Sequence, residues 1–107
     1  MKRSEDFRRV REEGVRARRD GVTVFVAPAA PGRLGGRVGI TVPGVVGRAV
    51  VRNRVRRRLR AALQTTDLGP GRDVVVRADP SAAEASYLEL ETHVKSALSS
   101  ANEGLRA

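Results

Sequence analysis

The chain has 107 residues, no cysteine and a formal net charge of +9. Its length allows one domain with a modest core, and a 40% share of hydrophobic residues argues against intrinsic disorder. The composition excludes disulfides and thiolate metal sites, and neither a bilayer-spanning run nor an apolar signal region is present, so we expect a soluble cytoplasmic protein.

The positive charge is concentrated in one block of the sequence. Residues 1–20 carry a net charge of +3, residues 21–66 carry +9 with no acidic residue, and residues 67–107 carry −3. The excess of arginine over lysine is typical of GC-rich genomes, but that bias does not explain 46 consecutive residues without an acid. The block indicates a polyanionic partner, and nucleic acid is the expected class.

The first half of the chain predicts one helix and then strands. A helix at 4–13 is indicated by Ser4 as its N-cap, acidic residues in its first turn and Gly14 beyond its end. The β-branched VTVFVAP at 22–28 predicts a strand, and residues 15–19 can add a short strand ahead of it. A flexible turn is expected at 31–36, after which RVGITV at 37–42 should pair back as a strand.

The second half alternates helix and strand. After a basic helix, described next, residues 69–73 predict a loop and DVVVRA at 73–78 a third clear strand. The last helix is expected to start at Asp79-Pro80 and the Ser81/Glu84 pair, with His93 on its polar flank. Its sheet-facing side comprises Ala83, Tyr87, Leu90, Val94, Ala97, Leu98 and Ala101. The order is α-β-β-α-β-α within a single domain, 1–107.

The segment GRAVVRNRVRRRLRAAL at 47–63 holds seven arginines and no acid. On a helical wheel, an apolar stripe covers roughly a third of the circumference; its members are Val51, Val55, Leu59, Ala62 and Leu63. Asn53, Arg56, Arg57 and Arg60 project from the opposite side, Arg54 and Arg58 lie on the flank, and Arg52 lies nearer the apolar edge. Like charges at i,i+4 cost about 0.2–0.5 kcal/mol each, so we expect a bound anion rather than a merely solvated charged face.

The stretch AVVRNRVRRRLR resembles the signature helix of the bacterial ribonuclease P protein subunit, whose hallmark is the Arg-Asn-Arg found here at 52–54. Other segments resemble that family in the same order: DFRRV with Gly14 its first helix, VTVFVAP and RVGITV two of its strands, and DVVVRA with the Pro80 helix its closing β-α unit. The resemblance implies an α/β (α+β) two-layer sandwich with a mixed sheet and a left-handed β-α-β crossover, like a domain of a ribosomal protein. Sequence pattern alone predicts the common right-handed crossover.

The resemblance also implies a function. The chain would be the protein subunit of a ribonuclease in which a large RNA is the catalyst and removes the 5′ leader of precursor transfer RNA. Magnesium would be bound mainly by that RNA and the substrate, with no protein-only metal site. The implied partners are the catalytic RNA and precursor transfer RNA, with no membrane and no small-molecule substrate.

By position, the family's contacts to the catalytic RNA fall on Arg48, Arg52, Asn53, Arg54, Arg56, Arg57 and Arg60. Phe7, Arg11 and Phe25 would line the leader cleft, where aromatic faces stack on single-stranded bases. The chain departs from the family pattern at three places. Arg11 replaces a second aromatic or apolar residue, the loop at 43–47 lacks two usual lysines, and Arg56-Arg57 replaces Lys-Arg.

Two other classes of function stay open on the sequence. An autonomous metal-dependent hydrolase needs clustered carboxylates or imidazoles, but the acids lie outside the basic block and the single histidine has no evident partner. GRLGG also lacks the Lys-Ser/Thr of a phosphate-binding loop. A basic structural RNA-binding protein of the ribosome or its assembly would carry a similar charge distribution, but it would need only the arginine face and no separate single-strand site.

Overall fold

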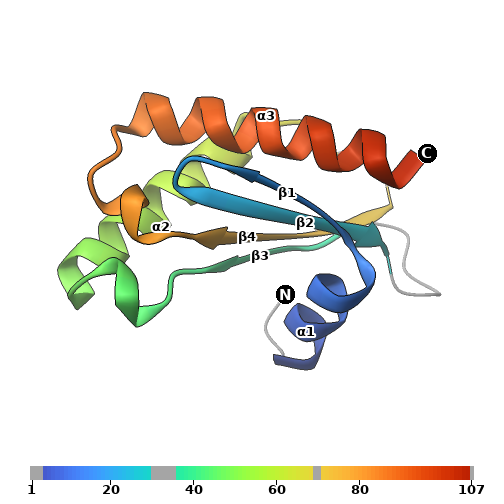
Figure 1. The fold of residues 1–107 in the computed structure, drawn as a ribbon, viewed down its shortest axis with the longest axis horizontal. Helices are drawn as coiled ribbons and strands as arrows, with labels where there is room; N and C mark the ends of the chain where they lie inside the picture. The colour runs from blue at the N-terminus through green and yellow to red at the C-terminus, as the bar shows by residue number, and fades with distance from the viewer. Residues whose placement is uncertain (1–3, 30–35, 69–70, 107) are drawn as a thin grey trace.

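The computed structural model describes residues 4–29, 36–68 and 71–106, so most of the turn expected at 31–36 and part of the loop at 69–73 lie outside the described residues. Within these ranges the elements are α1 (Ser4–Glu13), β1 (Val15–Arg19), β2 (Val22–Pro28), β3 (Val38–Thr41), the 3-10 turn η1 (Gly44–Val46), α2 (Ala49–Gln64), β4 (Arg72–Ala78), the 3-10 turn η2 (Pro80–Ala83) and α3 (Tyr87–Arg106). The predicted order of helices and strands is confirmed, including the short strand at 15–19 (Figure 1).

The four strands form one mixed sheet in the order β1-β2-β4-β3. β1 pairs antiparallel with β2, and β2 pairs antiparallel with β4, whereas β3 pairs parallel with β4. The strand at 37–42 therefore does not pair back on its predecessor β2, because β4 lies between them. α2 connects the parallel neighbours β3 and β4, which makes a β-α-β crossover unit whose hand stays a prediction.

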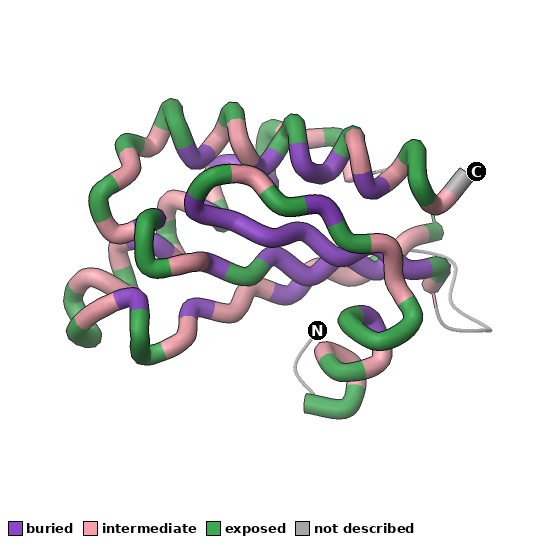
Figure 2. The backbone as a smooth tube through the Cα atoms, in the orientation of Figure 1, coloured by how far each residue is buried: buried purple, intermediate pink, exposed green. Residues whose placement is uncertain are grey.

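The core lies mainly between the sheet and two helices. Val22, Val24 and Val26 of β2 face α2 and α3 and are fully buried, and their partners on β4 are buried with them; these partners are Ala78, Val76 and Val74. The opposite face of the sheet is covered at one end only, by α1, where Val10 packs with Phe25 in a smaller cluster. Figure 1 shows α1 on the other side of the sheet from α3, and Figure 2 shows the buried residues concentrated in the central strands. No other helix of the described ranges covers the rest of that second face, which is called the open face below.

The predicted start of the last helix is wrong. Pro80–Ala83 forms η2, and α3 begins only at Tyr87. The reciprocal bonds of a capping box are made by a second pair with the same spacing: the Ser86 amide donates to Glu89 Oε1 at 2.9 Å and the Glu89 amide donates to Ser86 Oγ at 3.1 Å. The bond from the Ser86 amide lowers the pKa of Glu89. The apolar face is as expected, with Ala83 and Tyr87 half-buried and the other five members buried.

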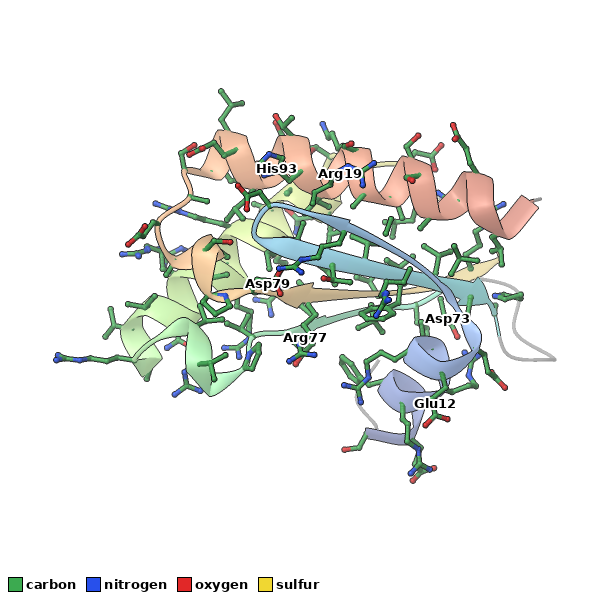
Figure 3. All side chains as sticks on the ribbon, viewed as in Figure 1. Glu12, Arg19, Asp73, Arg77, Asp79 and His93 are labelled. Carbon is green, nitrogen blue, oxygen red and sulfur yellow. The ribbon has the colours of Figure 1, made fainter. Side chains whose placement is uncertain are left out.

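A buried carboxylate ties α1 to the sheet. Asp73 at the start of β4 is fully buried, and its Oδ1 accepts a hydrogen bond from the Arg37 amide at 3.0 Å. Its Oδ2 accepts from the Arg37 guanidinium at 3.3 Å and from Arg9 of α1. Arg37 also donates two bonds of 3.2 Å to Asp6 of α1, and these bonds, followed by the one to Asp73, raise the pKa of Arg37. Figure 3 shows Asp73 beside α1.

Replacing Asp73 with asparagine should destabilise the protein strongly. The neutral amide leaves two guanidinium groups without their buried counter-ion, and a loss of about 3 kcal/mol in the free energy of unfolding is expected. The loss should stay near the lower end for a broken buried pair because the side chains of Arg9 and Arg37 remain 26% and 18% exposed. Urea denaturation followed by circular dichroism measures it, with the exposed Asp20→Asn as the matched control. Equal stability of the two variants would contradict this role.

Candidate nucleic-acid interface

α2 docks on the sheet through the stripe predicted from the sequence. Val55, Leu59 and Ala62 are fully buried and Leu63 is nearly so, while Val51 is half-buried against the same core. Because this stripe is fixed, the opposite side of the helix is directed outward. The basic residues of α2 are therefore held on one rigid element rather than on a loop.

The outward side of α2 is cationic and unneutralised. Arg48, Asn53, Arg57 and Arg60 are exposed, and none of the ion pairs within the described ranges involves an arginine of residues 48–60. Arg56 donates to Asn53 Oδ1 at 3.1 Å, which orders two neighbouring side chains on this surface. Such an array is complementary to a polyphosphate, because guanidinium groups match phosphate geometry with paired donors.

Three other arginines of this segment bond backbone carbonyls. Arg52 Nε donates to the Gly47 oxygen at 3.1 Å. Arg54 and Arg58 donate to the oxygens of Ala83 and Ala85, each at 2.8 Å. No sequence pattern indicates the last two bonds, because their acceptors are 29 and 27 residues away in the chain.

A hollow of about 510 Å³ lies along the free edge of β3, between α1 and α2. Phe7 of α1 and Ile40 of β3 contribute apolar lining, and Arg56 and Arg60 of α2 contribute cations. The remaining lining residues are Val38, Gly39, Leu63, Gln64 and Leu68. The structure thus brings one predicted leader residue, Phe7, close to two predicted RNA-contact arginines.

The open face of the sheet holds a second hollow, of about 360 Å³. Its lining residues are Arg16, Arg18, Thr23, Phe25, Arg77 and Asp79. The strand register places Arg18, Thr23 and Arg77 in one row across β1, β2 and β4. Figure 3 shows Arg77 and Asp79 toward the end of the sheet that α1 leaves uncovered. Asp79 forms an ion pair with Arg18 at 3.4 Å, so cationic charge predominates here.

The three residues predicted to line the leader cleft differ in how far they are exposed. Phe25 is 8% exposed and packs with Val10, so it is mainly a core residue that also lines the open-face hollow. Phe7 is half-buried against the same cluster. Arg11 is exposed and shares a smaller hollow of about 270 Å³ with Phe7, Ser4, Ile40 and Thr41.

The basic residues of the open face were not among the residues predicted to bind RNA. Arg16 and Arg18 alternate with Val15 and Ala17 along β1, so their common face was recognisable in the sequence. Arg77 could not be assigned in the same way, because its position beside them depends on the pairing of β2 with β4.

Polar side chains at the start of α3 form hydrogen bonds with one another and with the end of α2. Tyr87 donates to Glu91 at 3.0 Å, which raises the pKa of Tyr87 and lowers that of Glu91, and Thr65 at the end of α2 donates to the same carboxylate at 3.1 Å. His93 is half-buried beside Glu89. In the part of the chain that the structure describes, no group of three or more histidine, cysteine, aspartate or glutamate side chains is placed to hold a metal ion. No helix there has the length and apolar character needed to cross a membrane.

Comparison with known proteins identifies the family. The family model for ribonuclease P matches residues 1–102. The ribonuclease P protein component of Beutenbergia cavernae is 48% identical over 109 residues, covering 100% of this chain and 89% of that protein. The component of Thermobifida fusca is 42% identical over 106 residues, covering 92% and 72%.

Solved structures show the same fold. The ribonuclease P protein of Staphylococcus aureus superposes with a TM-score of 0.82 at 23% identity, covering 94% of this chain and 93% of that one. That of Thermotoga maritima gives a TM-score of 0.72 at 21% identity, covering 95% and 91%. With the sequence relatives and the family match, these similarities show that the chain belongs to the ribonuclease P protein family.

Proposed function

We propose that this protein binds the catalytic RNA of ribonuclease P through α2 and holds the 5′ leader of precursor transfer RNA between α1 and the open face of the sheet. The observation that carries the proposal is the unneutralised cationic side of α2, which is rigidly presented and has no acidic partner among the described residues. A second basic hollow on another face of the same small domain supports a separate site for a single strand.

The proposed catalytic-RNA contacts are the outward residues Arg48, Asn53, Arg56, Arg57 and Arg60, with Arg52 beside them. Their guanidinium groups neutralise backbone phosphates and release counterions, which gives affinity without base specificity. Binding also relieves the like-charge repulsion along α2. This contact does not require a particular RNA sequence, but it does require a phosphate arrangement that matches the helix.

The proposed leader site combines a small aromatic surface with several cations. Phe7 and the exposed edge of Phe25 provide faces on which bases can stack, and Arg11 supplies charge in a hollow that it shares with Phe7. Arg16, Arg18 and Arg77 extend the cationic surface along the sheet. Since stacking and phosphate contacts tolerate any base, the site suits leaders of varied sequence.

In this proposal the protein positions RNA and the RNA carries out hydrolysis. Magnesium supplies Lewis-acid activation and is bound mainly by the catalytic RNA and the substrate. The protein's guanidinium groups lower the repulsion between the two RNAs, so less magnesium is needed for productive binding. The site of action is the cytoplasm, where precursor transfer RNA is matured.

Reconstitution tests this function. Cleavage of precursor transfer RNA by a bacterial ribonuclease P RNA at low magnesium should be strongly stimulated by this protein. Replacing Arg56, Arg57 and Arg60 together with glutamine should weaken binding of the catalytic RNA roughly 100- to 500-fold at 0.1 M salt, because three phosphate contacts are lost. Circular dichroism checks that the variant is folded, and Lys95→Gln on α3 is the control for a lost basic charge.

Two results would contradict the proposal. Folded protein that gives no stimulation with its cognate RNA would leave a basic RNA-binding domain, with the ribosome as the next partner to test. Cleavage of precursor transfer RNA by the protein alone would show that the protein, and not the RNA subunit, is the catalyst.

The charge on α2 also predicts stabilisation by anions. Sulfate at ten times its Kd should add about 1.4 kcal/mol of stability, which corresponds to roughly 6 °C in Tm for a domain of this size. Thermal melts in sulfate and in chloride at equal ionic strength measure the gain. It should shrink in Arg57→Gln and persist in Lys95→Gln. The same gain in both variants would exclude α2 as the anion site.

A further inference from the structure

Two arginines on one flank of α2 do not face the solvent side of the helix. Arg54 and Arg58 lie one turn apart and reach the connection between η2 and α3. Arg54 Nη2 donates to the Ala83 oxygen and Arg58 Nη1 to the Ala85 oxygen, each at 2.8 Å in a part-buried setting. Both side chains are half-buried, whereas Arg57 between them in the sequence is exposed.

The backbone oxygens of Ala83 and Ala85 accept hydrogen bonds from these guanidinium groups and not from the backbone of the described residues. Among the described residues no backbone amide donates to the oxygen of either Ala83 or Ala85, because this connection falls between the last bonds of η2 and the first turn of α3. Ala83 and Ala85 are half-buried, so without these donors their carbonyls would depend on water for hydrogen bonds. The guanidinium groups of α2 therefore complete the hydrogen bonding of a segment that follows them by 27 to 29 residues in the chain.

We propose that Arg54 and Arg58 are positioning residues that form a latch: they hold the 80–86 connection against α2 and fix the direction of its phosphate-binding side without contacting RNA themselves. The proposal rests on the proposed RNA-binding role of α2. It divides the arginines of that helix into two inward members and an outward set, and it differs from the family-based expectation, which assigns Arg54 to the catalytic RNA.

The environment of Arg54 supports the division. Its Nε is buried, which places this part of the guanidinium inward, and no group of the described residues accepts a hydrogen bond from it. An RNA phosphate that recruited the Nη2 donor of Arg54 would displace it from the Ala83 oxygen and leave that carbonyl without this bond. Arg48, Arg57 and Arg60 have no such bond among the described residues and can meet a phosphate without breaking one.

The chain offers a matched comparison for the test. Arg54 and Arg57 carry the same charge on the same helix, and each is replaced with methionine and with glutamine. Binding of the complete catalytic RNA is measured over a range of salt concentrations, thermal melting reports stability, and hydrogen exchange reports the amides of residues 81–90. Glutamine keeps an N–H donor for the carbonyl but removes the charge, so it separates the two roles.

If Arg54 belongs to a latch, substitutions at Arg54 and Arg57 should differ in their effects on Tm, hydrogen exchange and the salt dependence of RNA binding. Arg54→Met should lower Tm, speed hydrogen exchange in residues 81–90 and weaken RNA binding. The slope of log K against log salt should equal that of the unmodified protein, because no phosphate contact is lost. Arg54→Gln should recover part of the lost Tm. Arg57→Met and Arg57→Gln should both reduce the magnitude of the slope by about 0.7–0.9 with no loss of Tm, because each removes one phosphate contact.

The opposite pattern would overturn the latch. An Arg54→Met protein with unchanged Tm and exchange, and with a slope reduced as in Arg57→Met, would make Arg54 a direct phosphate contact. If Arg54→Met fails to fold, Arg58→Met provides the same comparison from the second anchor. Failure of the unmodified protein to bind the RNA would refute the proposed function instead, and the latch would then be decided by Tm and exchange.

Discussion

The buried carboxylate of Asp73 is the constraint on which the working surfaces of this small domain depend. It lies at the start of β4 with no solvent exposure and joins Arg9 of α1 to Arg37 ahead of β3. A buried charge of this kind requires its partners, so α1 cannot leave the sheet without a large loss of stability. Because α1 is held at one end of the sheet, Phe7 reaches the edge of β3. The remainder of that sheet face is not covered by another helix of the described ranges.

Arginine serves two purposes in the same fold. In some positions its donors complete internal hydrogen bonding, as at Asp73 and at the carbonyls beside η2. In others, along the outward side of α2, the same group is exposed with no acidic partner in the described ranges. The net charge of +9 is therefore a poor guide to how many cations are available to RNA. Availability depends on which guanidinium groups the fold has already engaged.

Local patterns predicted much of this structure. The apolar stripes of α2 and α3 and the strand at 22–28 follow from residue periodicity, and the arginine helix followed from charge and its family signature. The start of α3 was misplaced because two Ser-x-x-Glu pairs have the same spacing, and only tertiary packing selects Ser86 and Glu89. The position of β3 beside β4, the Asp73 network and the bonds of Arg54 and Arg58 join distant segments, so no local pattern could indicate them.

The proposed function requires one small domain to present two surfaces to two different RNAs. Photo-crosslinking in the assembled holoenzyme with precursor transfer RNA tests it most directly, with p-benzoylphenylalanine placed at Arg57 on α2 or at Arg77 on the open face of the sheet. Crosslinks are expected from position 57 to the catalytic RNA and from position 77 to the 5′ leader. Crosslinks from both positions to the same RNA, in a holoenzyme that cleaves its substrate, would contradict it.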